Sequence, residues 1–234
     1  LARPELLFLS AIVANGLLVF LGTSWIGQPM GDLNFAYQDW ANAGSAFGIS
    51  VAWVYPYLAL VPITLANALT PGALIGGWMA IWLLFNLAVL CVLVFYRVGE
   101  DREARYRAGY FWVLATLCLG PVSISRLDAF SVGFAILGLL FVYLRFSKVA
   151  SLFLTVALWI KVWPIALTSA VFVAVRGKLR WFVTLAAGSL VAIVVAMFLG
   201  GNSSVFSFLG DQSSRGIQIE SPIAAFWLWP AVVG

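Results

Sequence analysis

The chain has no histidine, only two cysteines, and few charged residues, which make up 9% of its 234 positions. A soluble globular protein needs about a quarter of its residues to be charged, so this composition excludes that class. Cys91 and Cys118 both lie inside apolar runs, which leaves no basis for a disulfide framework or for a metal site with cysteine and histidine ligands. We therefore predict no metal and no cofactor.

What the chain has in abundance is apolar side chains, at 63% of its residues, with a mean hydropathy of +1.04. These values predict an integral membrane protein. The net charge of +4 does not indicate nucleic-acid binding, because the cations lie at the ends of apolar runs instead of in a basic patch interleaved with aromatics. The last residues lie within a new apolar run, so we expect a fragment that lacks later spans at its C-terminus.

Long apolar runs predict an all-α fold, a polytopic transmembrane helical bundle that forms a single domain over residues 1–234. Residues 6–26 form a run of about 21 residues, long enough at 1.5 Å per residue to cross a hydrocarbon core of about 30 Å. Further spans are expected near residues 73–96, 109–124, 129–144, 149–160, 164–175, 181–199 and 222–234.

Residues 31–56 are the one long segment that is neither a span nor a basic connector. From Leu33 to Phe47 the apolar and aromatic residues follow a helical stripe, with polar residues opposite, which is typical of an amphipathic helix lying flat at a membrane surface. This segment also carries two carboxylates, Asp32 and Asp39, and we expect it to hold the chemistry. The alternative is that Asp32 only caps this helix and Asp39 lies on a solvated flank.

Cytoplasmic loops of membrane proteins carry an excess of Lys and Arg. This tendency helps decide which of the shorter apolar segments cross the membrane. Residues 57–69 are apolar but short, and we expect Pro62 to interrupt them, so they could cross the membrane or dip into it. We prefer that they dip, because then residues 27–72 form one external loop with interfacial helices. If the two short runs around Lys161 also form a hairpin, ten of the 13 cations become cytoplasmic. These ten are Arg3, Arg97, Arg102, Arg105, Arg107, Arg145, Lys148, Arg176, Lys178 and Arg180.

The same topology gathers a second set of charges on the outer face, comprising the acids Asp32, Asp39, Asp128, Asp211 and Glu220 and the bases Arg126, Lys161 and Arg215. A charge at bilayer depth costs about 2.5 to 3.5 kcal/mol, so an ionisable group between short apolar runs indicates a functional site. Arg126 and Lys161 both lie at such breaks, although they could simply extend toward the outer headgroups. A lipid phosphate is the simplest ligand for these cations, with a nearby carboxylate as general base.

Several short motifs resemble those of the GT-C glycosyltransferases. They are Gly31-Asp32 followed by Tyr37, the pair Tyr55-Pro56, the run DAFSVGFAILGLL, the hinge from Lys161 to Pro164, and the sequence RGIQIES at residues 215–221. Within that fold the chain is most similar to the actinobacterial polyprenol-phosphate-mannose-dependent α-mannosyltransferases, including the type that extends phosphatidylinositol mannosides.

The resemblance implies a multi-pass enzyme of the cell membrane with its active site on the extracytoplasmic face. It would transfer a hexose, mannose by analogy, from a polyprenyl-phosphate sugar donor to a glycolipid or glycan acceptor. Asp32 matches the family's catalytic base, and Lys161, with Arg215 and Arg126, would neutralise the leaving phosphate. The resemblance and the charge pattern together make the substrate-binding candidates Tyr37, Asp39, Tyr55, Arg126, Asp128, Lys161, Arg215, Gln218 and Glu220.

A membrane transporter or lipid flippase is the alternative, because short interrupted apolar segments beside a charge also mark transporter sites. The absence of an internal repeat argues against it, as does the expected position of unpaired charges at the outer ends of spans instead of mid-helix. A purely structural membrane subunit would leave the outer charges unexplained.

Overall fold

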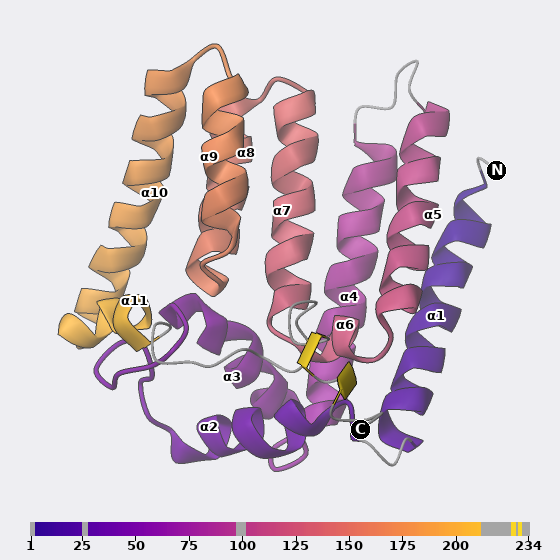
Figure 1. Ribbon diagram of the computed structural model, residues 1–234, viewed down its shortest axis with the longest axis horizontal. Coiled ribbons are helices and arrows are strands. Elements are labelled where there is room, and N and C mark those ends of the chain that lie inside the picture. The colour runs from indigo at the N-terminus through magenta and orange to yellow at the C-terminus, as the bar shows by residue number, and fades with distance from the viewer. Residues whose placement is uncertain (1–2, 25–27, 97–101, 212–225, 228, 231–234) are drawn as a thin grey trace.

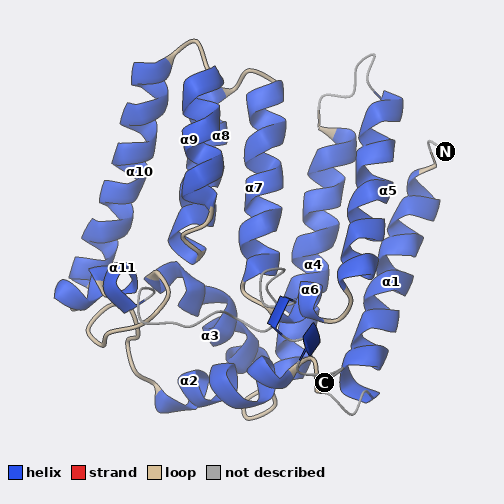
Figure 2. Cartoon of the chain, in the orientation of Figure 1, coloured by secondary structure: helices blue, strands red, loops and turns tan. Residues whose placement is uncertain are grey.

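The computed structural model describes residues 3–24, 28–96, 102–211, 226–227 and 229–230. Within these residues the regular secondary structure is entirely helical, which confirms the all-α prediction (Figure 2). Three helices are long and apolar enough to cross a membrane: α1 (Pro4–Ser24), α4 (Leu74–Phe95) and α10 (Lys178–Phe198). They correspond to the expected spans at residues 6–26, 73–96 and 181–199.

Seven helices run roughly side by side, upright in Figure 1, namely α1, α4, α5 (Arg102–Leu119), α7 (Asp128–Tyr143), α8 (Ser147–Ile160), α9 (Pro164–Ala174) and α10. The short helices α2 (Gln38–Ala43), α3 (Leu60–Leu69) and α6 (Val122–Ser125) gather at their lower ends, which we call the α2 end. The connections α7–α8 and α9–α10 lie at the opposite end, which we call the basic end because it carries Arg145, Lys148, Arg176, Lys178 and Arg180.

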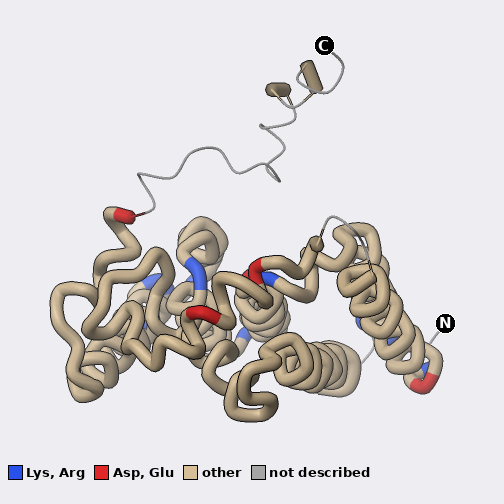
Figure 3. The backbone as a smooth tube through the Cα atoms, turned by 90° about the horizontal axis from the view of Figure 1, so that it is seen from below, with Lys and Arg blue, Asp and Glu red and all other residues tan. Residues whose placement is uncertain are grey.

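Charged residues are sparse along this bundle. Figure 3, viewed from the α2 end, shows a few short red and blue segments on a tube that is otherwise uncharged. Many apolar side chains remain on the outside of the bundle. Phe111 and Phe198, for example, are 71% and 88% exposed. An outer surface of this kind suits contact with hydrocarbon.

The helix breaks lie close to the predicted positions, with one correction. The expected span at residues 109–124 is replaced by α5, which begins at Arg102 and ends at Leu119. Gly120, at φ +72°, ends that helix, and Pro121 precedes the short α6, so the break begins before residue 124, where the expected span ends. The expected span at residues 222–234 lies largely outside the described residues.

The amphipathic helix of the predicted external loop exists, but it is shorter than expected. A π-helical turn, η1 (Leu33–Tyr37), continues directly into α2. The helix then stops because Gly44 adopts a left-handed conformation at φ 58°. The predicted stripe from Leu33 to Phe47 was therefore wrong at its end, since Phe47 lies beyond the helix.

The segment after α2 folds back and covers it with aromatic rings. Trp53 lies edge-on to Trp40, with ring centroids 5.1 Å apart, and Tyr55 lies edge-on to Trp53 at 5.3 Å. The Ser207 hydroxyl accepts from the Trp53 N–H at 2.7 Å and donates to the Trp53 carbonyl at 2.8 Å. These contacts tie the loop to the chain that follows α10, so the loop has a fixed position over the α2 end.

A short 3₁₀ turn, η2 (Tyr57–Ala59), leads into α3, which lies against α4 (Figure 1). Its 10 residues rise about 15 Å, roughly half of a hydrocarbon core. Pro62 does not interrupt this helix, contrary to expectation, because it lies in the first turn, where its missing N–H would have no helical partner. The tight α3–α4 contact depends on Gly77, where an added Cβ would lie 2.1 Å from the Ala66 carbonyl oxygen.

Three tryptophan side chains connect the helices that support the α2 end. Trp82 Nε1 donates to Asn15 of α1 at 2.8 Å, and Trp78 Nε1 donates to the Ile124 carbonyl of α6 at 2.9 Å. Trp112 Nε1 donates to Asn86 at 2.7 Å and joins α5 to α4. Buried polar bonds between helices fix their relative positions, and here they hold the segment around Arg126 in place.

Candidate functional site

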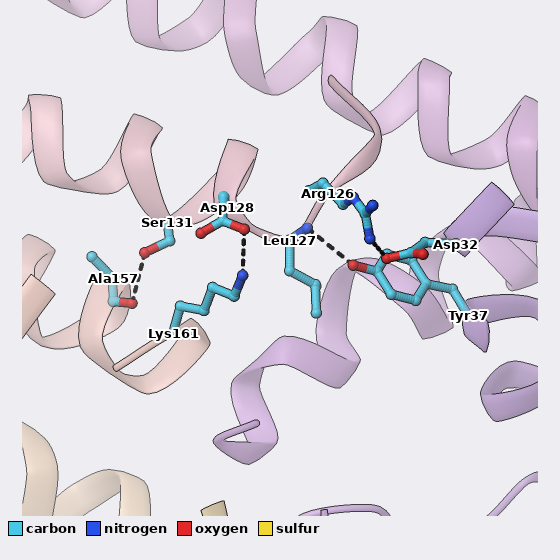
Figure 4. A network of polar contacts seen from close by, with 8 residues as sticks. All are labelled: Asp32, Tyr37, Arg126, Leu127, Asp128, Ser131, Ala157 and Lys161. Carbon is cyan, nitrogen blue, oxygen red and sulfur yellow. Dashed lines mark hydrogen bonds and ion pairs between the residues drawn. The ribbon is translucent and has the colours of Figure 1, made fainter. Parts of the chain in front are cut away.

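A network of charged and polar side chains crosses the α2 end of the bundle (Figure 4). Its members come from three breaks between helices. Asp32 precedes η1, Arg126 and Asp128 flank the start of α7, and Lys161 follows the last residue of α8. Where a helix is interrupted, backbone polar groups lack helical partners and side chains can point along the helix axis. Such breaks therefore suit a binding site.

Asp32 forms an ion pair with Arg126. The two side chains are 35% and 28% exposed, so solvent or a ligand can reach both. Asp32 makes no side-chain capping bond to the helix that follows it, which removes the alternative that it is only a helix cap. Tyr37, one turn further along, accepts a hydrogen bond at its phenol oxygen from the Leu127 N–H at 3.3 Å and so positions the residues around Arg126.

Lys161 forms the second ion pair, with Asp128. These side chains are 25% and 42% exposed, and the Lys161 ammonium also lies 5.4 Å from the centroid of the Tyr55 ring. The backbone at Lys161 is extended, at φ −146° and ψ 147°, between the end of α8 and Pro164 at the start of α9. Ser131 donates to the Ala157 carbonyl at 3.0 Å and holds α7 against α8 just above this pair.

The two pairs form one continuous set because Arg126 and Asp128 are separated only by Leu127. Acidic and basic groups alternate along it, from Asp32 through Arg126 and Asp128 to Lys161 (Figure 4). Partly exposed ion pairs contribute only about 0 to 1 kcal/mol each, so an anionic ligand can exchange with either carboxylate. The arrangement therefore offers two cations to a phosphate and two carboxylates that such a ligand would release.

An apolar cavity of about 310 Å³ adjoins this network. Ile160, which lines it, is the direct neighbour of Lys161, and Phe130, also in its wall, lies two residues after Asp128. Its full lining, drawn from η2, α3, α4, α7 and α8, is Leu58, Val61, Pro62, Leu65, Ile81, Phe85, Phe130, Phe134, Val156 and Ile160. A charged network beside an apolar cavity matches a ligand with an anionic head and a hydrocarbon tail.

The structure brings together five of the residues that the sequence singled out: Asp32, Tyr37, Arg126, Asp128 and Lys161. Tyr55 joins them through its ring, whereas Asp39 lies on the exposed side of α2 and is absent from the network. Arg215, Gln218 and Glu220 lie outside the described residues. Arg126 and Lys161 were expected to be unpaired charges, and that expectation was wrong because each has a carboxylate partner.

Sequence reasoning missed the cavity wall and the aromatic group of Trp40 and Trp53. The signal for the second was the alternation of Trp53, Tyr55 and Tyr57, which places aromatic rings on every other residue. The cavity has no local signal, since its wall is assembled from residues on five separate elements.

Neither ion-paired carboxylate belongs to a metal-ligand cluster, because the described residues hold no group of three or more Cys, Asp or Glu side chains that could bind a metal ion. Comparison of the chain with protein-family models, with curated proteins and with solved structures finds no match. The function is therefore argued from the site's own geometry.

Proposed function

We propose that this protein is a membrane glycosyltransferase of GT-C type that transfers a hexose from a polyprenyl-phosphate sugar to a lipid-linked or glycan acceptor. The observation that carries the proposal is the pairing of two exchangeable ion pairs with an adjoining apolar cavity. The resemblance of the motifs around Asp32, Tyr37 and Lys161 to the mannosyltransferases supports mannose as the sugar. In this proposal the chain is a multi-pass protein of the cell membrane, and the α2 end faces the extracytoplasmic side.

The donor lipid would bind with its hydrocarbon chain in the apolar cavity and its phosphate at Lys161 and Arg126. The phosphate would displace Asp128 from Lys161 and Asp32 from Arg126, and it would gain charge-assisted hydrogen bonds from both cations. Negative charge that develops on the leaving phosphate would be stabilised by both cations, and more strongly once the bound donor has displaced water from the site. Arg215, outside the described residues, would add a third cation.

The exchange at Arg126 gives Asp32 its catalytic role. Once the guanidinium has turned to the phosphate, the Asp32 carboxylate is free to accept the proton of the acceptor hydroxyl. The acceptor oxygen forms a bond to the anomeric carbon while the bond from that carbon to the phosphate oxygen breaks, through an oxocarbenium-like state. The products are the glycosylated acceptor, the polyprenyl phosphate and protonated Asp32.

The acceptor would approach from the open side of the α2 end. Tyr37 and Tyr55 lie at the network but are buried, so they would hold the charged side chains in place, whereas Asp39 is exposed on the same helix unit as Asp32 and could contact the acceptor directly. Gln218 and Glu220 complete the proposed acceptor side.

A transporter or lipid flippase is the second candidate, favoured by the break between α8 and α9 at Lys161, because interrupted helices beside a charge also form transporter sites. The charges gather at one end of the bundle instead of at the middle of α7 or α8, which favours the transferase.

The test uses membranes that contain the full-length protein and a radiolabelled polyprenyl-phosphate mannose. We expect label to move to a second lipid or glycan, and to stay on the donor when Asp32→Asn replaces the wild type. Movement of the labelled donor between leaflets with no labelled product would support the flippase instead.

A further inference from the structure

A second cavity lies at the basic end of the bundle. In Figure 1 this end lies opposite the α2 end, which holds the proposed transferase site. It measures about 360 Å³ and is formed where the α7–α8 connection meets the α9–α10 connection. Its wall consists of Val142, Arg145, Ser147, Ala174, Val175, Arg176 and Gly177. Two guanidinium-bearing residues from connections far apart in the sequence thus line one cavity.

No carboxylate among the described residues forms an ion pair with a residue that lines this cavity. The sequence from residue 129 to residue 210 contains no Asp or Glu, yet it includes Arg145, Lys148, Arg176, Lys178 and Arg180. Among the described residues, the ion pairs are Arg107–Glu103, Arg126–Asp32 and Lys161–Asp128, and none of them involves a residue of this cavity. A concentration of like charge with no acid beside it attracts an anion.

Backbone donors add to this charge. Helices α8 and α10, of 14 and 21 residues, begin beside Ser147 and Gly177, and neither has a side-chain cap at its N-terminus. Their first N–H groups therefore have no helical partner and carry the positive end of the helix dipole. The carbonyls at the end of α7 are already occupied, because Val142 accepts from the Arg145 N–H at 3.0 Å and Phe141 from the Phe146 N–H at 2.8 Å.

Arg145 holds its position at a conformational cost. Its backbone is left-handed, at φ 62°, in the place after a helix end that glycine usually occupies. A non-glycine residue in that conformation carries backbone strain.

The excess of cations in cytoplasmic loops would explain the sign of the charge at this end. It does not explain why two arginines and two uncapped helix starts share one cavity. We propose that this cavity binds a phosphate group, and that the phosphate is carried by the headgroup of an anionic phospholipid. Planar guanidinium groups suit bidentate contact with phosphate, and basic cavities between helices at a membrane surface suit such headgroups. This inference does not depend on the proposed transferase activity.

The test compares two double variants of the full chain in detergent micelles. Arg145→Asn with Arg176→Gln removes both cavity charges, and asparagine tolerates the left-handed backbone. Arg102→Gln with Arg107→Gln is the matched control, because it removes two charges from α5 at the same end of the bundle, outside the cavity. Binding of short-chain phosphatidylglycerol, phosphatidylcholine and inorganic phosphate is measured for each.

We expect the wild type to prefer phosphatidylglycerol over phosphatidylcholine, and the cavity variant to bind phosphatidylglycerol about tenfold more weakly, which corresponds to the loss of one strong charge-assisted contact. The control should change by less than about twofold, because Arg102 and Arg107 do not line the cavity. Inorganic phosphate that binds as tightly as the lipid, and depends on the same two arginines, would assign the site to free phosphate. Equal losses of phosphatidylglycerol affinity in both double variants would overturn the proposal. The lipid would then be attracted by the overall positive charge of the basic end and not by the cavity.

Arg145→Gly provides a second readout. Without ligand its melting temperature should rise, because glycine relieves the backbone, while its affinity for phosphatidylglycerol falls. A variant that melts higher but binds the lipid as tightly as the wild type would show that Arg145 has no part in binding.

Discussion

At the scale of the residue, Asp32 is the side chain on which the proposed chemistry depends. Asp32 makes no side-chain capping bond, and among the described residues its ion pair is with Arg126. A partly exposed pair of this kind contributes little to the stability of the fold. A partly exposed carboxylate that makes no capping bond and belongs to a charged network is better explained by the proposed chemistry than by a role in folding. Its removal should therefore affect turnover far more than folding.

Asp32→Asn keeps the size of the side chain and removes its basicity. We expect protein yield to be unchanged and turnover to fall by about 10² to 10⁴, equivalent to roughly 3 to 5 kcal/mol of transition-state stabilisation. The measurement is the initial rate of sugar transfer from the labelled donor. Asp39→Asn is the control, because Asp39 lies on the exposed side of α2, and it should cost less than about tenfold. Normal turnover in Asp32→Asn would place the base elsewhere.

Lys161 is predicted to bind the donor through its charge. Lys161→Ala should weaken donor binding by about tenfold or more, whereas Lys161→Arg should retain part of it, since a phosphate contact is mainly Coulombic. Donor affinity is measured by competition with the unlabelled polyprenyl phosphate. Loss of the ion pair with Asp128 alone would lower stability slightly but leave affinity unchanged, so equal affinity in the alanine variant would return Lys161 to a structural role.

The sequence singled out these residues, but it did not indicate their partners. Arg126 and Lys161 stood out because charges between short apolar runs are expensive, a local property. Their pairing with Asp32 and Asp128 depends on how distant segments meet at the α2 end, which no spacing in the sequence indicates.

At the scale of the element, the wall of the apolar cavity depends on the contact between α3 and α4. Val61, Pro62 and Leu65 of α3 face Ile81 and Phe85 of α4 across the cavity. The Gly77 N–H donates to the Thr70 hydroxyl at 2.8 Å, so the chain between the two helices is fixed as well. Any change that separates the helices should alter the cavity and the binding of the donor's hydrocarbon chain.

Gly77→Ala should separate them. The new Cβ would meet the Ala66 carbonyl oxygen at 2.1 Å, and backbone cannot move aside cheaply, so we expect a loss of about 1 to 3 kcal/mol and weaker donor binding. Gly76→Ala is the matched control one position earlier, where the nearest atom lies 3.5 Å away, and it should be neutral or slightly stabilising. Thermal unfolding in detergent distinguishes them, and equal melting temperatures for the two variants would contradict the close α3–α4 contact.

Helix positions were predictable because apolar runs end at glycine, proline or charged residues, as at Lys161 and Pro164. The predicted helix ends were wrong where the backbone conformation of a single residue determines the end. The end of α2 is set by the left-handed Gly44, and the hinge before α6 by Gly120, and neither follows from hydrophobic periodicity. Pro62 was misjudged because its effect depends on its position in the helix.

At the scale of the whole molecule, the two ends of the bundle differ in how their charges are arranged. At the α2 end the described cations Arg126 and Lys161 pair with carboxylates. At the basic end, the chain around the α7–α8 and α9–α10 connections carries five cations in a stretch of sequence without acids. If the bundle spans a membrane, the positive-inside tendency places the basic end in the cytoplasm and the proposed transferase site on the other side. The two proposed ligand sites would then contact opposite leaflets.

A pair of single cysteines tests this orientation in a background in which Cys91 and Cys118, both exposed, are replaced by alanine. Ser45→Cys lies exposed just after α2, and Gly177→Cys lies at the basic end, where an added Cβ meets nothing within 4 Å. We expect an impermeant thiol reagent applied to intact cells to label Ser45→Cys at once and Gly177→Cys only after the membrane is permeabilised. The reverse pattern would invert the topology, and then a donor lipid reaching Lys161 would have to come from the cytoplasmic leaflet. Labelling of both without permeabilisation would mean that the bundle does not separate the two ends, and the argument from the distribution of cations would fail.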